Sequence, residues 1–219
     1  MMTERHVSTT ALLVLLSVVL AAFSPLIAED PSHPLCRLLL REEQAERDDL
    51  ELEVGLAGAE LTAAEEIFKL LDQLWKDDAV ERILFLAGKH DRDAAKLEQE
   101  HRALLVERQD ALIDQYRLLC DAPSGEIAEE RRAAVERTYQ RYLGLECDRL
   151  AKEVAIARVD LAYRQEVLVS VRDLRENSVA TRQDVVLAER NVELARKRNE
   201  HGSRRVENCR GEIADKPSH

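Results

Sequence analysis

The chain has 219 residues, of which 34% are charged and only 4% aromatic, and its net charge is −11. Such a composition, dominated by Ala, Leu, Glu, Arg and Val, is typical of long amphipathic helices and not of a compact mixed core. The negative charge disfavours nucleic acid and anionic lipid as the main partner, because both carry charge of the same sign.

The first 28 residues have the pattern of an export signal. Arg5 precedes an uncharged run from 11 to 23, and a cleavage pattern ends at Ala28. The run of about 13 residues is shorter than the roughly 20 needed for a helix to span a bilayer. We therefore expect an exported, periplasmic or cell-envelope protein with no stable transmembrane span, and an uncleaved membrane anchor as the alternative.

Prolines divide the rest of the chain into two long stretches, 35–122 and 124–216, that are free to be helical. Near its middle each stretch has short polar residues that favour a turn, Lys76-Asp77-Asp78 in the first and Glu176-Asn177-Ser178 in the second. The pattern predicts an all-α fold, a coiled-coil rod made of two long antiparallel helical hairpins. The predicted hairpins occupy 29–122 and 123–212, before a disordered tail at 213–219, and their helices span 35–76, 79–120, 126–175 and 179–212.

The third predicted helix shows the coiled-coil pattern most clearly. Its apolar positions alternate in four- and three-residue steps over about four heptads, which keeps one stripe facing a partner helix. Arg164 is the polar member, and its long stem can lie along the seam with the charged group in water. The stripe consists of Leu143, Cys147, Leu150, Val154, Ala157, Leu161, Arg164, Leu168 and Val171.

The four cysteines lie symmetrically about the two predicted turns. Cys36 and Cys120 are centred on Asp78, and Cys147 and Cys209 are centred on Ser178. A chain that reverses at both turns brings each cysteine level with its partner, so we predict these two disulfides. An even cysteine count fits an oxidising compartment. Four free thiols remain the alternative, and the wide spacing of the cysteines disfavours a zinc site.

The two halves also repeat one another at a spacing of 100 residues, which predicts an internal duplication. Ten identities fall within a window of 37 residues. They are Glu46, Asp48, Leu50, Glu53, Val54, Ala57, Leu61, Glu66, Leu74 and Arg82, each with its counterpart 100 positions later.

The second turn resembles the periplasmic tip of the TolC-like outer-membrane efflux proteins. The residues that carry the resemblance run from Ser178 through Thr181, Arg182 and Asp184 to Glu189. A shorter copy lies at 78–87 in the first half. The resemblance covers the helical hairpins, and it implies an exported protein whose hairpins pack side by side into a helical tunnel.

In that family the tips dock the hairpins of a membrane-fusion adaptor, so the resemblance implies a protein partner: such an adaptor or a second copy. The alternative is a periplasmic scaffold or spacer with no transport role. The expected contact residues at the tips are Asp77, Asp78, Arg82, Asn177, Ser178, Thr181, Arg182 and Asp184.

Signals for an enzyme are weak. Glu98-x-x-His101 is half of the paired motif of di-iron bundles, and the second half is missing. We interpret it, and His90-Asp91-Arg92-Asp93, as charged helix faces. We therefore expect no catalytic residues, no cofactor and no metal site.

A few residues near the turns have predicted structural roles. Trp75 and Phe85 flank the first turn and are expected to close that end of the hairpin, as is Tyr163 near the second, although an aromatic there could also anchor a partner. Arg82 and Arg182 are expected either to pair with Asp78 or Asp184, or to bind across a turn or to a partner.

Overall fold

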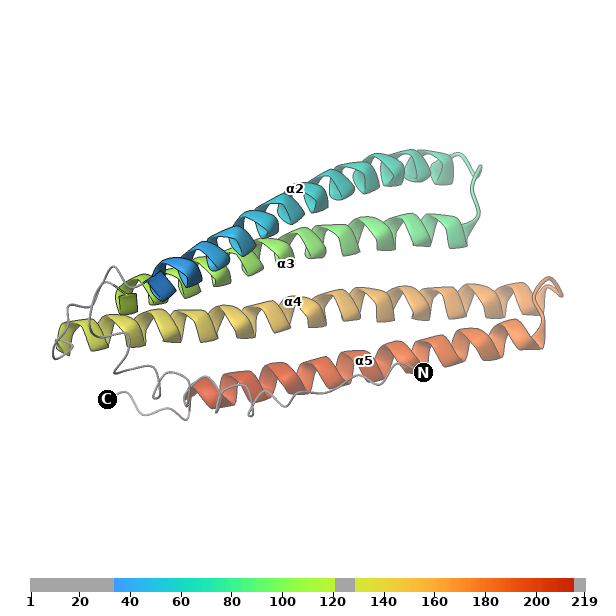
Figure 1. The fold of residues 1–219 in the computed structure, drawn as a ribbon. Coiled ribbons are helices and arrows are strands. Elements are labelled where there is room, and N and C mark those ends of the chain that lie inside the picture. The colour runs from blue at the N-terminus through green and yellow to red at the C-terminus, as the bar shows by residue number, and fades with distance from the viewer. Residues whose placement is uncertain (1–33, 121–128, 215–219) are drawn as a thin grey trace.

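The structure, a computed structural model, describes residues 34–120 and 129–214 and consists there of four long helices (Figure 1). The all-α prediction with two antiparallel hairpins is confirmed. The predicted signal peptide and the loop at 121–126 lie outside the described residues. The helices are α2 (Pro34–Lys76), α3 (Arg82–Cys120), α4 (Glu129–Glu176) and α5 (Arg182–Ala214).

The helices lie in a row, each beside the next in the chain, and not as a closed bundle (Figure 1). Extensive packing joins α2 to α3, α3 to α4 and α4 to α5. At 1.5 Å per residue the helices are roughly 50–70 Å long. Both hairpin turns lie at the same end of this rod (Figure 1).

Apolar seams hold each hairpin together. In α4 the predicted stripe is buried or half-buried along its whole length, and Leu150 and Val154 pack against Val206 of α5. Gly202 permits this approach, because an added Cβ would lie 2.9 Å from a methyl of Val154. Arg164 pairs with Asp160 at 3.0 Å, with its side chain 40% exposed as expected.

Both predicted disulfides are present, Cys36 to Cys120 and Cys147 to Cys209, each with its Cα atoms 5.7 Å apart. They bridge neighbouring helices of the same hairpin, as the symmetry about the turns predicts. The first closes its hairpin near the end far from the turn, and the second lies partway along α4. None of the described helices has both the length and the apolarity needed to cross a membrane.

The predicted helix ends need small corrections. The helices after the turns begin at Arg82 and Arg182, three residues later than predicted, because three non-helical residues follow each left-handed reversal. Helix α5 reaches Ala214, so the predicted disordered tail starts within the helix. The predicted start of the third helix at 126 lies outside the described residues, which resume at Glu129 within α4.

A charged seam joins the two hairpins along α3 and α4. Arg108 bonds to Glu146 at 2.7 Å, Lys152 pairs with Glu100, and Lys89 lies 3.7 Å from Glu166. Burial raises the pKa of Glu146, but hydrogen bonds from Arg149 and Arg108 outweigh it and leave the pKa below its usual range. The seam thus lies along the contact between the two hairpins.

Candidate functional site at the paired hairpin tips

The first turn ends α2 by a left-handed cap. Asp78 has a φ of 51°, and its N–H donates to the Trp75 carbonyl at 3.1 Å. The next N–H, of Ala79, donates to the Leu74 carbonyl at 2.8 Å. These two bonds form a Schellman motif, which satisfies the carbonyls that the end of a helix leaves without partners.

The second turn repeats this geometry 100 residues later. Ser178 has a φ of 61°, and its backbone N–H donates to the Arg175 carbonyl at 2.9 Å. The N–H of Val179 donates to the Leu174 carbonyl at 2.8 Å. The two predicted turn centres therefore occupy equivalent left-handed positions, where glycine is the usual residue.

Thr181 caps the start of α5. Its backbone N–H and its hydroxyl both donate to the Asp184 carboxylate, at 2.8 and 2.7 Å, and the Asp184 N–H donates back to the Thr181 hydroxyl at 3.2 Å. This is a capping box with aspartate as the acidic member. The Thr181 hydroxyl and backbone N–H hold the pKa of Asp184 below its usual range.

A groove of about 370 Å³ lies between the two tips. Arg82, at the start of α3, faces the end of α4 across it, with Nη1 3.7 Å from the Asp173 carboxylate. Val179 is 71% exposed and Leu174 is 36% exposed, so the groove offers apolar surface beside charge. Its lining comprises Glu81, Arg82, Ile83, Ser170, Asp173, Leu174, Asn177 and Val179.

Two of the eight predicted contact residues line the groove. Arg82 and Asn177 line it, whereas Asp77, Asp78, Ser178, Thr181 and Arg182 lie at the exposed turns beside it. Asp184 instead lines a separate depression between α4 and α5. Arg82 pairs with Asp173, and Asp184 bonds to Thr181. The alternative in which the two arginines pair with Asp78 or Asp184 is therefore not what the described residues form.

The α4 residues Ser170 and Asp173 of this groove were not among the predicted contact residues. Ser170 and Asp173 precede the turn by five or more residues, and they meet Arg82 only because α3 packs on α4. One signal was present in the sequence: the apolar Leu174 and Val179 lie on either side of the polar turn Glu176-Asn177-Ser178, and both are exposed in the structure. Such residues suit a contact surface better than a solvated loop.

The aromatic residues behave as expected at the first turn only. Phe85 stacks on Trp75 with ring centroids 5.2 Å apart and contacts Phe68 at 5.6 Å. Tyr163 lies away from the tip, where it contacts His90 of α3 at 4.6 Å. It therefore helps to join the two hairpins and does not close the second one.

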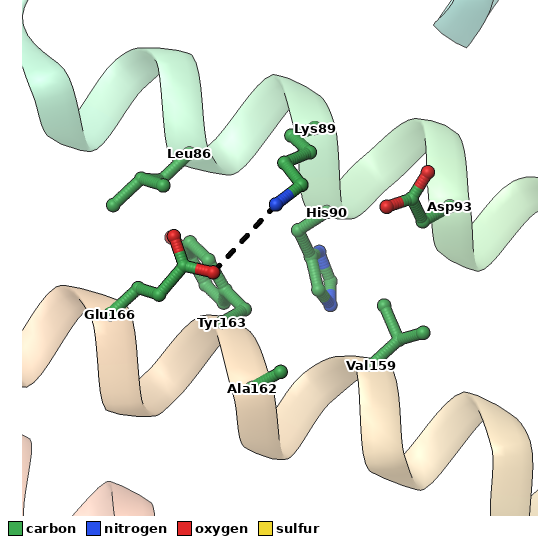
Figure 2. Close-up of a pocket in the computed structure, with 8 residues that line it drawn as sticks. All are labelled: Leu86, Lys89, His90, Asp93, Val159, Ala162, Tyr163 and Glu166. Atoms are coloured by element: carbon green, nitrogen blue, oxygen red, sulfur yellow. Dashed lines mark ion pairs between the residues drawn. The ribbon is translucent and has the colours of Figure 1, made fainter.

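His90 and Tyr163 face a small cavity between α3 and α4 (Figure 2). Its volume is about 80 Å³, enough for a few water molecules and too small for a typical ligand. Lys89 and Glu166 form an ion pair at its edge (Figure 2). Within residues 34–120 and 129–214, no three potential metal ligands converge here or elsewhere.

The Glu98-x-x-His101 motif lies in the charged seam. His101 is 4.0 Å from Glu98 and 3.9 Å from Glu153 of α4, and both ring nitrogens are buried without a hydrogen-bond partner. Burial lowers its pKa, and the two nearby glutamates oppose that shift. His101 is thus a packed residue of the seam, which corrects the interpretation of this motif as a charged helix face.

The chain matches no protein-family model, no curated protein and no solved structure.

Proposed function

We propose that this protein acts by protein–protein contact at its paired hairpin tips, as a non-enzymatic exported protein similar to the periplasmic hairpins of TolC-like efflux components. The observation that carries the proposal is the groove between the tips, which combines the exposed Val179 and Leu174 with the Arg82–Asp173 pair. Apolar surface bordered by charge is typical of a protein-binding site.

A helical hairpin tip of an adaptor is the partner that fits this groove. The groove has a volume of about 370 Å³ and lies beside the two turns, so it suits the turn of another hairpin better than a long helix. Charges of both signs at its edge, from Glu81, Arg82 and Asp173, favour a partner with a mixed polar turn. The two disulfides support an exported location, because disulfides persist in oxidising compartments.

A scaffold or spacer is the second candidate. The row of long helices, cross-linked by two disulfides, gives an element tens of ångströms long that can separate two envelope components. In that role the tips need no specific partner, so a test at the groove distinguishes the two functions.

Site-specific photo-cross-linking in the envelope of the native host tests the proposal. A photoreactive residue at Val179 should give one discrete adduct with another protein, and the same residue at Leu194, 46% exposed on α5, should not. Replacing the cation of the Arg82–Asp173 pair with an anion, by Arg82→Glu, should abolish the adduct. No adduct from Val179, or equal adducts from both positions, would contradict tip docking and favour the spacer.

A further inference from the structure

Helix α2 carries a second apolar stripe on a face that no other helix covers in the part of the chain that the structure describes. Its five large side chains are 44–68% exposed, and its two alanines are also exposed. The residues follow one another in three- and four-residue steps over about six turns, as in a coiled-coil seam. The α2 stripe consists of Leu52, Leu56, Ala59, Ala63, Ile67, Leu70 and Leu74.

This α2 stripe is distinct from the seam that packs on α3. The α3-facing positions include Ala57, which is buried, and Leu61 and Phe68, which are half-buried. At 3.6 residues per turn, the α2 stripe lies roughly 140° around the helix from them. Helix α2 forms one edge of the row (Figure 1), and a Cβ added at Gly55 would meet nothing within 4 Å.

The α2 stripe is symmetric about Ala63. Leu52 and Leu74 are equally far from it along the helix, as are Leu56 and Leu70, and Ala59 and Ile67. If a second α2 lies antiparallel across a two-fold axis at Ala63, every stripe residue therefore meets an apolar residue. Exposed apolar faces of this extent mark interaction surfaces.

We propose that the α2 stripe is the interface of a two-fold symmetric dimer, in which α2 of one copy pairs antiparallel with α2 of another. Such an interface is self-complementary, the commonest arrangement in homo-oligomers. The small Ala63 at the axis allows the helices to approach closely. The α5 helix of a second copy is a poorer occupant, because its exposed large apolar residues, Val186, Leu187 and Leu194, all lie in its first half.

Charge gives the dimer a characteristic salt dependence. Helix α2 carries eleven acidic and five basic side chains, so two copies repel each other. Glu60 and Glu66 lie on opposite sides of the α2 stripe, each three residues from Ala63. In the antiparallel pair Glu60 of one copy is level with Glu66 of the other, and because the two lie on opposite sides of the seam their carboxylates stay apart. Screening reduces the repulsion, so added salt should strengthen the dimer, whereas a contact with a basic partner would weaken.

Sedimentation velocity on the full chain, with the disulfides intact, is the first test. We expect a dimer at micromolar concentration, and we expect its Kd to decrease as the salt concentration is raised from about 50 to about 500 mM. In Leu56→Glu the Kd should be at least about tenfold higher than in the wild type. Leu187→Glu, on α5, is the matched control, because its side chain is 56% exposed against 66% for Leu56, and it should dimerise like the wild type. A monomer at about 100 μM, or equal weakening by both variants, would overturn the proposal.

Cross-linking then locates the axis. Both disulfides occupy the four native cysteines, so a new cysteine supplies the one free thiol. Under mild oxidation Ala63→Cys should form a covalent dimer rapidly. Ala59→Cys should not, because residues 59 of the two copies lie roughly 12 Å apart along the axis, too far for a disulfide. Equal cross-linking of both variants would indicate parallel helices, and a dimer in which neither cross-links would indicate another interface; either result rules out the proposed pairing.

Discussion

In the turn between α2 and α3, Phe85 stacks on Trp75 and contacts Phe68, whereas in the turn between α4 and α5 Thr181 and Asp184 exchange hydrogen bonds. The backbones of these turns are equivalent, with the same two capping bonds and the same left-handed residue. At the position of Thr181 the first turn has Glu81, and at that of Asp184 it has Leu84. One backbone reversal can thus be closed by apolar packing or by polar capping.

Removing a disulfide should give the largest change in the free energy of unfolding, and comparing the two disulfides tests whether the hairpins are equivalent. They close loops of similar size, with sequence separations of 84 and 62 residues. We expect the free energy of unfolding to fall by about 4 kcal/mol in Cys36→Ser/Cys120→Ser, and by about the same amount in Cys147→Ser/Cys209→Ser. Urea denaturation measures both, with reduced wild-type protein as the control. A double variant with the wild-type midpoint would show that its hairpin does not depend on its disulfide.

Removing the aromatic closure should affect the first hairpin alone. Phe85→Ala deletes contacts with Trp75 and Phe68, and we expect it to lower the free energy of unfolding by about 2–3 kcal/mol. Leu84→Ala is the control, because Leu84 is 53% exposed and should cost less than about 0.5 kcal/mol. Equal losses from both variants in urea denaturation would mean that the stack does not stabilise this turn.

Removing the polar cap should affect the second hairpin alone. Thr181→Ala should cost about 1 kcal/mol, whereas Glu81→Ala at the equivalent position of the first turn should be nearly neutral. The variant should also raise the pKa of Asp184, which Thr181 holds below its usual range.

The pH dependence has a defined sign. Because the folded pKa of Asp184 is depressed, its contribution is present above the unfolded pKa and is lost as pH falls through the folded value. Carboxyl NMR titration of wild type and Thr181→Ala checks this shift. An unchanged Asp184 pKa in the variant would contradict the role of the capping box.

Glycine at the left-handed positions should stabilise both turns slightly and equally. Asp78→Gly and Ser178→Gly relieve the positive φ of a residue with a Cβ, and each should gain about 0.5–1 kcal/mol. Asp77→Gly is the control, because its φ is not positive and glycine there should only destabilise. A loss at Asp78 or Ser178 in thermal denaturation would show that its side chain contributes more than the strain costs.

Much of the fold could be predicted from local sequence signals. Proline positions, polar turn residues and heptad spacing define the four helices, and the placement of Cys36 and Cys147 relative to the turns predicts both disulfides. The helix starts at Arg82 and Arg182 were missed. At Arg182 a signal was present, because Thr181-x-x-Asp184 has the spacing of a capping box, whereas Glu81 and Leu84 give no such pattern before Arg82.

The sequence by itself determined where the chain is helical and where it reverses, because these properties depend on residues that are neighbours along the chain. Only the tertiary structure decided that α3 packs on α4, and therefore that Arg82 meets Asp173 in a groove between the tips. The seam between the hairpins is rich in ion pairs such as Arg108–Glu146. A chain with 34% charged residues offers many alternative pairs, and charge alone does not select among them.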